Sequence, residues 1–231
     1  MVKVRYDFHI HSCLSPCAAD EMTPATIVGF AALAGLDMIA VADHNSIQNV
    51  AAAMEAGKYY NVIVVPGMEL QTAEDIHVLC LFRSFDKLEA FYNSIEFTEL
   101  SNRKDIFGNQ FIVDIEDNII AEYPKYLLSA SSVSADTITG YISGFGGAAI
   151  PAHIDRPYNG MVGILGDVPD DFRVVEFSAN AEDSQIDEYS KRFKVIFNSD
   201  AHIPTEIMKR NSLMLSERSI DGLFEFLEGA K

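Results

Sequence analysis

The chain is short of basic residues. Its 231 residues contain 17 lysines and arginines against 34 aspartates and glutamates, which gives a formal net charge of −17 at pH 7. A negative field of this size keeps a protein in solution and repels polyanions. We therefore expect no long nucleic acid held through its phosphates as a partner, whereas a small phosphorylated substrate could still bind where local positive charge compensates.

Cysteines and long apolar runs are also scarce. Cys13, Cys17 and Cys80 are too few for a disulfide framework. No stretch approaches the roughly 18 consecutive apolar residues of a membrane span, so no membrane partner is expected. The first residues lack the apolar stretch and the cleavage pattern of a secretory signal. These absences predict a protein of the reducing cytoplasm, and they carry no signal for an oligomeric state.

What the chain does have is six histidines, each close to another side chain that can bind a metal ion. In chain order the clusters are His9-Ile10-His11, Asp43-His44, Glu69 followed by His77, His153-Ile154-Asp155, and Asp200-Ala201-His202. A single histidine is most often a structural residue, but six of six in such company are difficult to obtain by chance. The pattern predicts a site that holds more than one metal ion.

Most of these clusters follow a short apolar run bordered by turn residues. The runs cover residues 2–8, 38–41, 62–65, 148–150 and 195–197. Runs of this length, separated by helical patterns, are typical of parallel strands in an α/β protein. Because the carboxyl ends of parallel strands lie on one face, where barrels and doubly wound sheets place their active sites, we expect the clusters to meet there.

The remaining elements are predicted from caps and periodicity. Further strands are expected over residues 77–82, 174–177 and 212–215, and helices over 24–34, 46–55, 134–145 and 219–228. Thr23-Pro24 places an N-cap and a proline at the start of the first of these helices, and Gly35 follows its end.

Residues 84–132 interrupt the alternation of strands and helices. Within them we expect a helix over residues 87–99 and a hairpin whose strands, 111–114 and 119–121, flank a polar turn. We interpret residues 84–132 as an insertion that covers the ligand face or makes a subunit contact. The whole chain, residues 1–231, is predicted to be a single domain.

The candidate ligands mix imidazoles with carboxylates. This mixture suits Zn²⁺, Mn²⁺ or Fe²⁺ better than Ca²⁺. Such ions acidify bound water and polarise an ester oxygen, and two neighbouring ions can hold the attacking and leaving oxygens together. Glu69, two residues after Gly67, lies where the chain turns sharply and is placed to bridge two cations. The alternative interpretation is an ordinary exposed glutamate.

The combined order of these motifs resembles the polymerase and histidinol phosphatase (PHP) family of metal-dependent phosphoesterases. Each motif alone is weak, but the series spans residues 7–202 in the family's order. The matching segments are Asp7-Phe8-His9-Ile10-His11-Ser12, Ala42-Asp43-His44-Asn45, Pro66-Gly67-Met68-Glu69, His77, Pro151-Ala152-His153 and Ser199-Asp200-Ala201-His202.

The resemblance implies a fold and a ligand set. The fold would be a distorted seven-stranded β/α barrel of the TIM-like type, holding two or three divalent ions. Carried over by position, the first ion would be bound by His9, His11, Glu69 and Asp200, the second by Glu69, His77 and His153, and the third by His44 and His202. Asp43 would orient a ligand histidine from behind.

One further ligand of the third ion is left with two candidates. The family usually has an aspartate or histidine a few residues after its first histidine pair. Cys17 has the closer spacing, whereas Asp20 has the commoner chemistry for such a ligand. A buried thiol without a ligand role is the other interpretation of Cys17.

Phosphate recognition needs a cationic side chain besides the metal ions. Arg156, three residues after His153, is the preferred candidate because a guanidinium pairs with phosphate through two parallel hydrogen bonds. A salt bridge to Asp155 is the alternative. Arg103 and Lys104 lie on the insertion and could reach over the site, although a surface role is the simpler interpretation for both.

Together these features predict a metal-dependent phosphoesterase that hydrolyses a small ester, either a phosphomonoester or a short phosphodiester such as a nucleotide. Hydroxide generated at the metal ions would attack the phosphorus, with Glu69, Asp200 and Arg156 as the catalytic residues. One alternative is an amidohydrolase-type barrel acting on C–N bonds, but no lysine lies in a ligand cluster to form a carbamylated bridge. The other is a metal-stabilised regulatory module, against which the intact ligand set argues.

Overall fold

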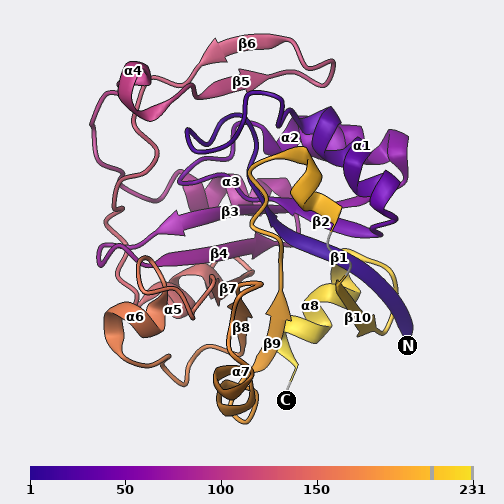
Figure 1. Cartoon of the computed structure of the whole chain (residues 1–231), viewed down its shortest axis with the longest axis vertical. Helices are drawn as coiled ribbons and strands as arrows, with labels where there is room; N and C mark the ends of the chain where they lie inside the picture. The colour runs from indigo at the N-terminus through magenta and orange to yellow at the C-terminus, as the bar shows by residue number, and fades with distance from the viewer. Residues whose placement is uncertain (209–210, 230–231) are drawn as a thin grey trace.

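The computed structural model describes residues 1–208 and 211–229 of the chain (Figure 1). Its largest sheet has six strands in the order β10-β1-β2-β3-β4-β7. The strands are β1 Val2–Ile10, β2 Met38–Val41, β3 Ile63–Gln71, β4 His77–Phe82, β5 Phe111–Val113, β6 Ile119–Glu122, β7 Gly147–Pro151, β8 Val174–Phe177, β9 Lys194–Phe197 and β10 Asn211–Leu215. Two further pairs, β5-β6 and β8-β9, form small separate sheets.

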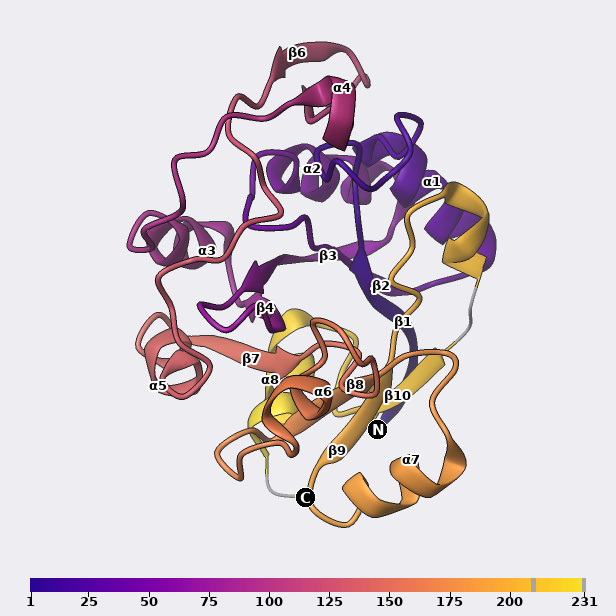
Figure 2. The same cartoon turned by 60° about the vertical axis from the view of Figure 1, so that its left-hand side comes forward.

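Helices cover the outside of the sheet and one end of it (Figures 1 and 2). They are α1 Pro24–Ala34, α2 Val50–Tyr60, α3 Phe85–Tyr92, α4 Lys104–Phe107, α5 Ile138–Ser143, α6 Met161–Leu165, α7 Asp183–Tyr189 and α8 Ile220–Glu228, with a 3₁₀ turn η1 at Pro204–Met208. In the part of the chain that the structure describes, no helix combines the length and the hydropathy needed to cross a membrane.

The predicted seven-stranded barrel is not confirmed. The main sheet curls but stays open, with six strands, and the parallel pair β8-β9 stands across the gap between β7 and β1 (Figure 2). In the described residues, backbone hydrogen bonds join the ends of these strands on each side of the gap. The Ile154 amide donates to the Glu176 carbonyl at 2.9 Å, and the His11 amide donates to the Ala201 carbonyl at 3.0 Å.

A competing strand explains why the barrel does not close. Strand β10 pairs antiparallel with residues 2–6 of β1, on the edge opposite β2, and so occupies the edge that β9 would need. Side chains then take the place of a backbone ladder between β1 and β9. The Asn198 amide oxygen accepts from the Phe8 N–H at 2.8 Å, and the Tyr6 hydroxyl accepts from the Phe197 N–H at 3.3 Å.

Most predicted elements are present, with shifted bounds. All eight predicted strands of the framework form, and so do both strands of the predicted hairpin as β5 and β6. The helix predictions with the largest errors are 46–55, where α2 covers Val50–Tyr60, 87–99, where α3 ends at Tyr92, and 134–145, where α5 covers only Ile138–Ser143. Helix α2 begins at Val50 rather than at residue 46 because Asn45 to Asn49 form turns that hold the site.

An irregularity in β1 points both histidines of the first motif the same way. The pairing of β1 with β2 shifts register between Asp7 and Ile10, the mark of a β-bulge. Phe8 lies among the inner core residues whereas Ile10 packs on the outside against α1. In a regular strand Phe8 and Ile10 would lie on the same face. The bulge changes this alternation, so that His9 faces inward together with Phe8.

The core has an inner and an outer layer. Inside the curled sheet, alternate residues of β1, β2 and β4 pack with Leu223, Phe224 and Leu227 of α8, which closes one end. Ser219 begins α8, as predicted, by accepting a hydrogen bond from the Gly222 N–H. Outside, α1 and α2 cover β1, β2 and β3. The metal-ligand candidates occupy the end of the sheet opposite α8, where the carboxyl ends of β1, β2 and β3 lie.

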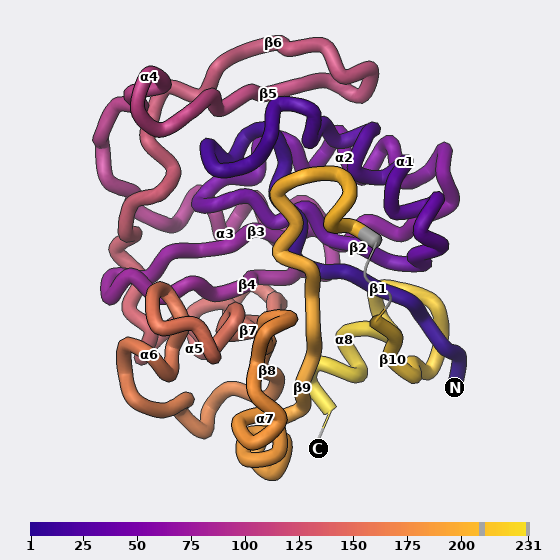
Figure 3. Tube along the Cα trace, viewed as in Figure 1, coloured from indigo at the N-terminus to yellow at the C-terminus, as the bar shows by residue number. Residues whose placement is uncertain are grey.

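The insertion arches over this end of the sheet as α4, β5 and β6, above α1 and α2 in the trace of Figure 3. It is attached to the loop that follows β1, since the Phe111 N–H donates to the Cys13 carbonyl at 2.9 Å. The Asp117 carboxylate accepts from the Ala25 N–H at 3.1 Å and so caps α1. The insertion thus lies against the loop after β1 and the start of α1, and its role as a cover of the ligand face stays a prediction.

Two helical glycines provide a matched test of the packing. A Cβ at Gly57 of α2 would lie 2.6 Å from the Val62 carbonyl oxygen and 2.8 Å from the Val64 side chain, whereas one at Gly140 of α5 would meet nothing within 4 Å. We expect Gly57→Ala to lower the free energy of unfolding by about 1–3 kcal/mol and Gly140→Ala to raise it by about 0.5–1 kcal/mol. Urea denaturation of both variants measures this, and equal effects would contradict the packing described.

Candidate metal centre

A single buried carboxylate lies at the centre of the histidine cluster. Glu69, on β3, is 1% exposed. Its two oxygens lie within 3.5 Å of ring nitrogens of five histidines. Oε1 is 2.9 Å from His77 Nδ1, 3.2 Å from His9 Nε2 and 3.3 Å from His153 Nε2, and Oε2 is 2.7 Å from His44 Nδ1 and 3.5 Å from His11 Nε2.

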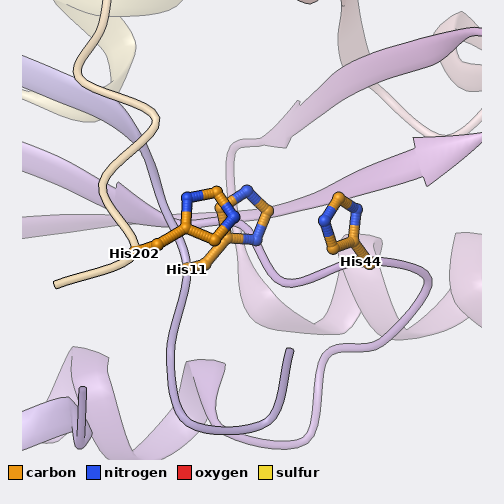
Figure 4. A group of neighbouring side chains, drawn as sticks. All are labelled: His11, His44 and His202. Atoms are coloured by element: carbon orange, nitrogen blue, oxygen red, sulfur yellow. The ribbon is translucent and has the colours of Figure 1, made fainter. Parts of the chain in front are cut away.

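The sixth histidine is reached through a second carboxylate. Asp200 Oδ1 lies 3.0 Å from His11 Nε2 and 3.5 Å from His9 Nε2, and 3.8 Å from His202 Nδ1. The rings of His44 and His202 each stack on His11 with centroids 4.4 Å apart. Figure 4 shows these three imidazoles, which come from three separate segments of the chain. The structure thus brings together eight predicted ligands: His9, His11, His44, Glu69, His77, His153, Asp200 and His202.

Backbone conformation at the cluster is unusual. His153, Asp200 and Asn45 have φ values of 31°, 51° and 44°, in the left-handed region that residues other than glycine adopt rarely. Such conformations persist only where surrounding contacts hold them, and they gather at functional sites. Here they follow the ends of β2, β7 and β9 and turn the adjacent side chains toward one point.

Two of the histidines have their tautomer set by a buried acceptor. His9 Nδ1 lies 3.0 Å from Glu176 Oε1, and a carboxylate can only accept, so Nδ1 carries the proton. Glu176 is in turn held by the Asn198 side-chain amide, which donates to Oε2 at 2.6 Å. His202 Nδ1 similarly donates to the backbone carbonyl of Asp200 at 2.8 Å. In the neutral form of each ring, Nε2 therefore keeps its lone pair.

A relay of hydroxyl and carboxylate does the same for His11. The Ser15 hydroxyl donates to Asp43 Oδ1 at 2.7 Å and therefore accepts from His11 Nδ1 at 3.1 Å. Asp43 also accepts from the Ser12 N–H and hydroxyl, at 2.7 and 2.6 Å. The predicted orienting role of Asp43 thus acts through Ser15, and all these groups are buried.

Electrostatics shift the pKa values of the clustered groups in different directions. Burial raises the pKa of Glu69, but the imidazoles of His77, His9 and His44 outweigh it and hold that pKa well below its usual value. Burial and the neighbouring His44 hold the pKa of His11 well below its usual value. Burial would also lower the pKa of His9, yet Glu176, Glu69 and Asp200 raise it well above the usual value. The field of the carboxylates therefore favours positive charge among the rings.

The donor atoms fit divalent cations. Three groups of side chains offer ligand atoms within 4.8 Å of one another: His9, His11 and Glu69; His44, Glu69 and His77; and His11, His44 and His202. Glu69 Oε2, His44 Nδ1 and His77 Nδ1 are buried without a hydrogen bond, although they lie close to one another. Donor atoms that converge on one point without hydrogen-bond geometry have the arrangement of ligands around a shared cation. The assignment of each side chain to a particular ion stays a prediction.

The two candidates for the remaining ligand lie outside these groups. Asp20 is exposed, and both its oxygens accept from the Asn109 side-chain amide, at 3.2 and 3.0 Å. As a whole residue Cys17 is exposed, although its surroundings desolvate the sulfur and, with the charges of Glu69 and Asp200, raise the pKa of the thiol to about 12. Which of the two residues would complete the ligand set stays a prediction.

A polar cavity of about 290 Å³ opens beside the cluster. Arg156 lines it and contacts Asp200, with Nη2 2.7 Å from Oδ2, while 45% of the Arg156 side chain stays exposed. Asn180 and Glu206 line the same cavity. A larger cavity, about 570 Å³, lies between β7, β8, α5 and α8, but its lining includes no histidine.

The basic residues of the insertion lie farther from the cluster. Arg103 pairs with Asp105 at 2.7 Å, and Lys104 pairs with Glu122 at 3.2 Å; all four side chains are substantially exposed. Neither lines the cavity beside Asp200. A substrate-binding role for Arg103 stays a prediction.

Sequence reasoning gave too little weight to the buried groups behind the ligands. Glu176, which orients His9, and Asn198, which holds Glu176, are both absent from the predicted site residues. Asp7 accepts from the Ser199 N–H at 3.0 Å and ties β1 to the segment that carries Asp200; burial raises the pKa of Asp7 to about 7. The available signal was a polar residue inside or just after an apolar strand, as in Val-Val-Glu-Phe and Val-Ile-Phe-Asn.

Solved structures share this fold. Endonuclease Q from Pyrococcus furiosus superposes with a TM-score of 0.69 at 17% identity. An endonuclease Q complex with a 27-mer duplex substrate, which has an abasic lesion at the active site, superposes with 0.67 at 16% identity. Each match covers 100% of this chain and 57% of the other, so this chain spans little more than half the length of endonuclease Q.

Two other structures match over nearly their whole length. One is a protein from Bifidobacterium adolescentis assigned as a metal-dependent phosphoesterase, with a TM-score of 0.60, 17% identity, and coverage of 98% of this chain and 96% of that one. The other is an amidohydrolase from Chromobacterium violaceum with bound sulfate and no metal, with 0.59, 18% identity, and 93% of each chain covered. At such identities the likeness establishes a common fold.

The expectation of a small phosphorylated substrate, with long nucleic acid excluded, is wrong. Endonuclease Q carries the same fold, and its complex holds a DNA duplex at the active site. The physical reason is that a net charge of −17 describes the whole surface. The field at one cleft is set instead by local arginines, amide groups and bound cations, which can oppose the overall charge.

The chain also matches a family at the level of sequence. No curated protein sequence matches it. The model of the PHP domain, however, matches residues 7–227, which include all eight of the clustered histidines and carboxylates. That match agrees with the motif order and with the convergence of the ligands at one end of the sheet. The chain belongs to the PHP domain family.

Proposed function

We propose that the chain is a metal-dependent hydrolase of phosphate esters, with nucleotides and nucleic-acid strands within its substrate class. The observation that carries the proposal is the position of Arg156. Its guanidinium contacts Asp200 at the edge of the cluster and lines the adjoining cavity, with nearly half of the side chain exposed to a substrate. A guanidinium in that place matches the oxygens of a phosphate.

Two or three divalent transition-metal ions, Zn²⁺, Mn²⁺ or Fe²⁺, would be held by the histidines together with Glu69 and Asp200. Bound there, such ions would acidify water and neutralise charge on the phosphate oxygens. The protein's own contribution is to fix the donors in place before the substrate arrives. Glu69 holds five rings around one carboxylate, and Asp200 joins the cluster to Arg156.

Arg156 has a different task from the metal ligands. Asp200 contacts Nη2 of the guanidinium, and the 45% exposure of the side chain leaves donors for a phosphate oxygen that does not react. The same ion pair fixes the direction of the guanidinium, which reduces the entropy lost when the substrate binds. Asn180 lies in the same cavity and adds a neutral donor for an ester or sugar oxygen.

The test of the proposal combines metal content with turnover. Elemental analysis of protein purified without chelator should find two or three transition-metal ions per chain, and a content below one would contradict a multinuclear site. The same sample is then assayed against a nucleoside monophosphate, a short oligonucleotide, a duplex with an abasic site, and an amide. Turnover of at least one phosphate ester and none of the amide is expected. The reverse result would favour the C–N hydrolase alternative, and no turnover by a metal-loaded sample would favour the regulatory module.

Glu176→Gln tests the orientation of His9. The substitution keeps the size of the side chain but replaces an obligatory acceptor with an amide that can also donate to Nδ1. We expect a loss of about ten- to a hundredfold in metal affinity or in turnover. Metal titration and kcat measure it. Glu188→Gln, an exposed carboxylate on α7, is the control and should change neither quantity.

Arg156→Lys tests the phosphate contact. Lysine keeps the charge but loses the planar fork, so kcat/KM should fall about ten- to a hundredfold, the worth of one hydrogen bond to a charged group. Metal content should stay constant. The matched control is Arg5→Lys, because Arg5 forms a similar half-exposed ion pair with Asp37 at the other end of the sheet. An unchanged kcat/KM for Arg156→Lys would show that this residue forms only a structural salt bridge.

A further inference from the structure

Two aromatic rings of the insertion stack on each other at its surface. The ring centroids of Phe107 and Tyr126 are 4.2 Å apart, and the planes are inclined by 33°. Phe107 is 39% exposed and Tyr126 is half-buried. An exposed pair of this kind is not part of a hydrophobic core, since neither residue belongs to the core clusters of the described chain. We call Phe107 and Tyr126 the ring pair.

Phe107 is anchored beside His11. The next residue, Gly108, packs so closely on the loop after β1 that a Cβ there would lie 2.5 Å from the Pro16 carbonyl oxygen. The residue before Pro16 is Ser15, whose hydroxyl lies 3.1 Å from His11 Nδ1. The segment that carries Phe107 therefore contacts the loop that holds His11, a metal-ligand candidate.

Tyr126 is anchored beside His44. The next residue, Leu127, accepts a hydrogen bond from the Asn45 side-chain amide at 2.8 Å, and Asn45 directly follows His44. The oxygen of the same Asn45 side-chain amide accepts from the Gln71 N–H at 2.9 Å, which connects this contact to the end of β3. The ring pair is thus carried by two segments that contact the loops holding His11 and His44.

Three basic residues lie near the ring pair in the chain. Arg103, Lys104 and Lys125 are the basic residues of residues 93–132, and all three lie within a few positions of Phe107 or Tyr126 in the chain. Each forms an exposed ion pair, with Asp105, Glu122 and Glu99 respectively. Exposed pairs of this kind contribute little to stability, so a phosphate can replace the carboxylate partner at low cost.

We propose that the ring pair is a stacking platform for a nucleobase of the substrate, which seats the adjoining phosphate ester at the histidine cluster. The inference rests on the proposed function and specifies its substrate as one that carries a base. Bases stack on aromatic side chains with little sequence preference, because every base presents a π-face. The described lining of the cavity beside Arg156 is mostly polar and includes no phenylalanine or tyrosine, so it suits the sugar and phosphate better than the base.

The absence of tryptophan makes a direct test possible. The sequence contains no tryptophan, so Phe107→Trp introduces a single fluorescent reporter into the ring pair. Stopped-flow mixing of the Zn²⁺-loaded variant with a short oligothymidylate should give a saturable loss of tryptophan emission before any turnover. Ribose 5-phosphate, which has a phosphate ester but no base, should give none. Thymidine 5′-phosphate is the third ligand, and a loss equal to that of the strand would show that one base suffices.

Tyr59→Trp is the matched control for the reporter. Tyr59 is 77% exposed on the last turn of α2, at the end of the sheet remote from the cluster. The same ligands should leave the emission of this variant unchanged. The proposal is overturned if Phe107→Trp shows no saturable loss with the oligothymidylate, or if Tyr59→Trp loses as much.

Turnover provides an independent arm. Phe107→Ala and Tyr126→Ala should each lower kcat/KM for the oligothymidylate by about tenfold, the size expected for one base–aromatic contact. Their kcat/KM for ribose 5-phosphate should match that of the unaltered protein. Equal losses on both substrates would mean that the rings only support the fold of the insertion. If the unaltered protein hydrolyses no phosphate ester, the proposed function fails, and the fluorescence arm still decides whether a base binds.

Discussion

The architecture of the site depends on how one buried negative charge is compensated. The Glu69 carboxylate is almost fully removed from water, and a lone carboxylate in that position would be costly. Five imidazoles from β1, β2, β4 and β7, or from the turns that follow them, surround it instead. The lone pairs that point inward can be satisfied together only by positive charge shared among them. This requirement couples four strand ends to one another, and the family's use of cations meets it.

The open side of the sheet has a role in this arrangement. Because β10 occupies the edge of β1, β8 and β9 stand apart and are joined to β1 by side chains rather than by a ladder. Glu176 and Asn198 lie in that gap and reach the cluster from behind, where a closed ladder would have left no room for polar side chains. The same gap brings Asp200 and Arg156 to the edge of the cluster, beside the polar cavity.

The insertion is connected to the chemistry rather than merely added to the surface. Its outgoing segment rests on the loop that holds His11, and its returning segment is bound by the residue after His44. A movement of the insertion would therefore act on the loops that carry two of the predicted ligands. Relatives of similar fold act on substrates as different as a DNA duplex and those of an amidohydrolase. Since the fold alone does not choose among them, residues of such peripheral segments are where specificity can differ.

The sequence by itself determined which residues form the site. Six histidines, Glu69 and Asp200 could be identified because ligands at the ends of parallel strands must converge, and the order of the motifs named the family. Strand positions were predicted well for the same reason, since apolar runs with clear borders depend on local pattern. Only the tertiary structure decided three things: that β10 keeps the barrel open, that Glu176 and Ser15 set the tautomers of His9 and His11, and that Phe107 and Tyr126 meet at the rim. Each is a contact between residues far apart in the chain, and no local periodicity or spacing encodes such contacts.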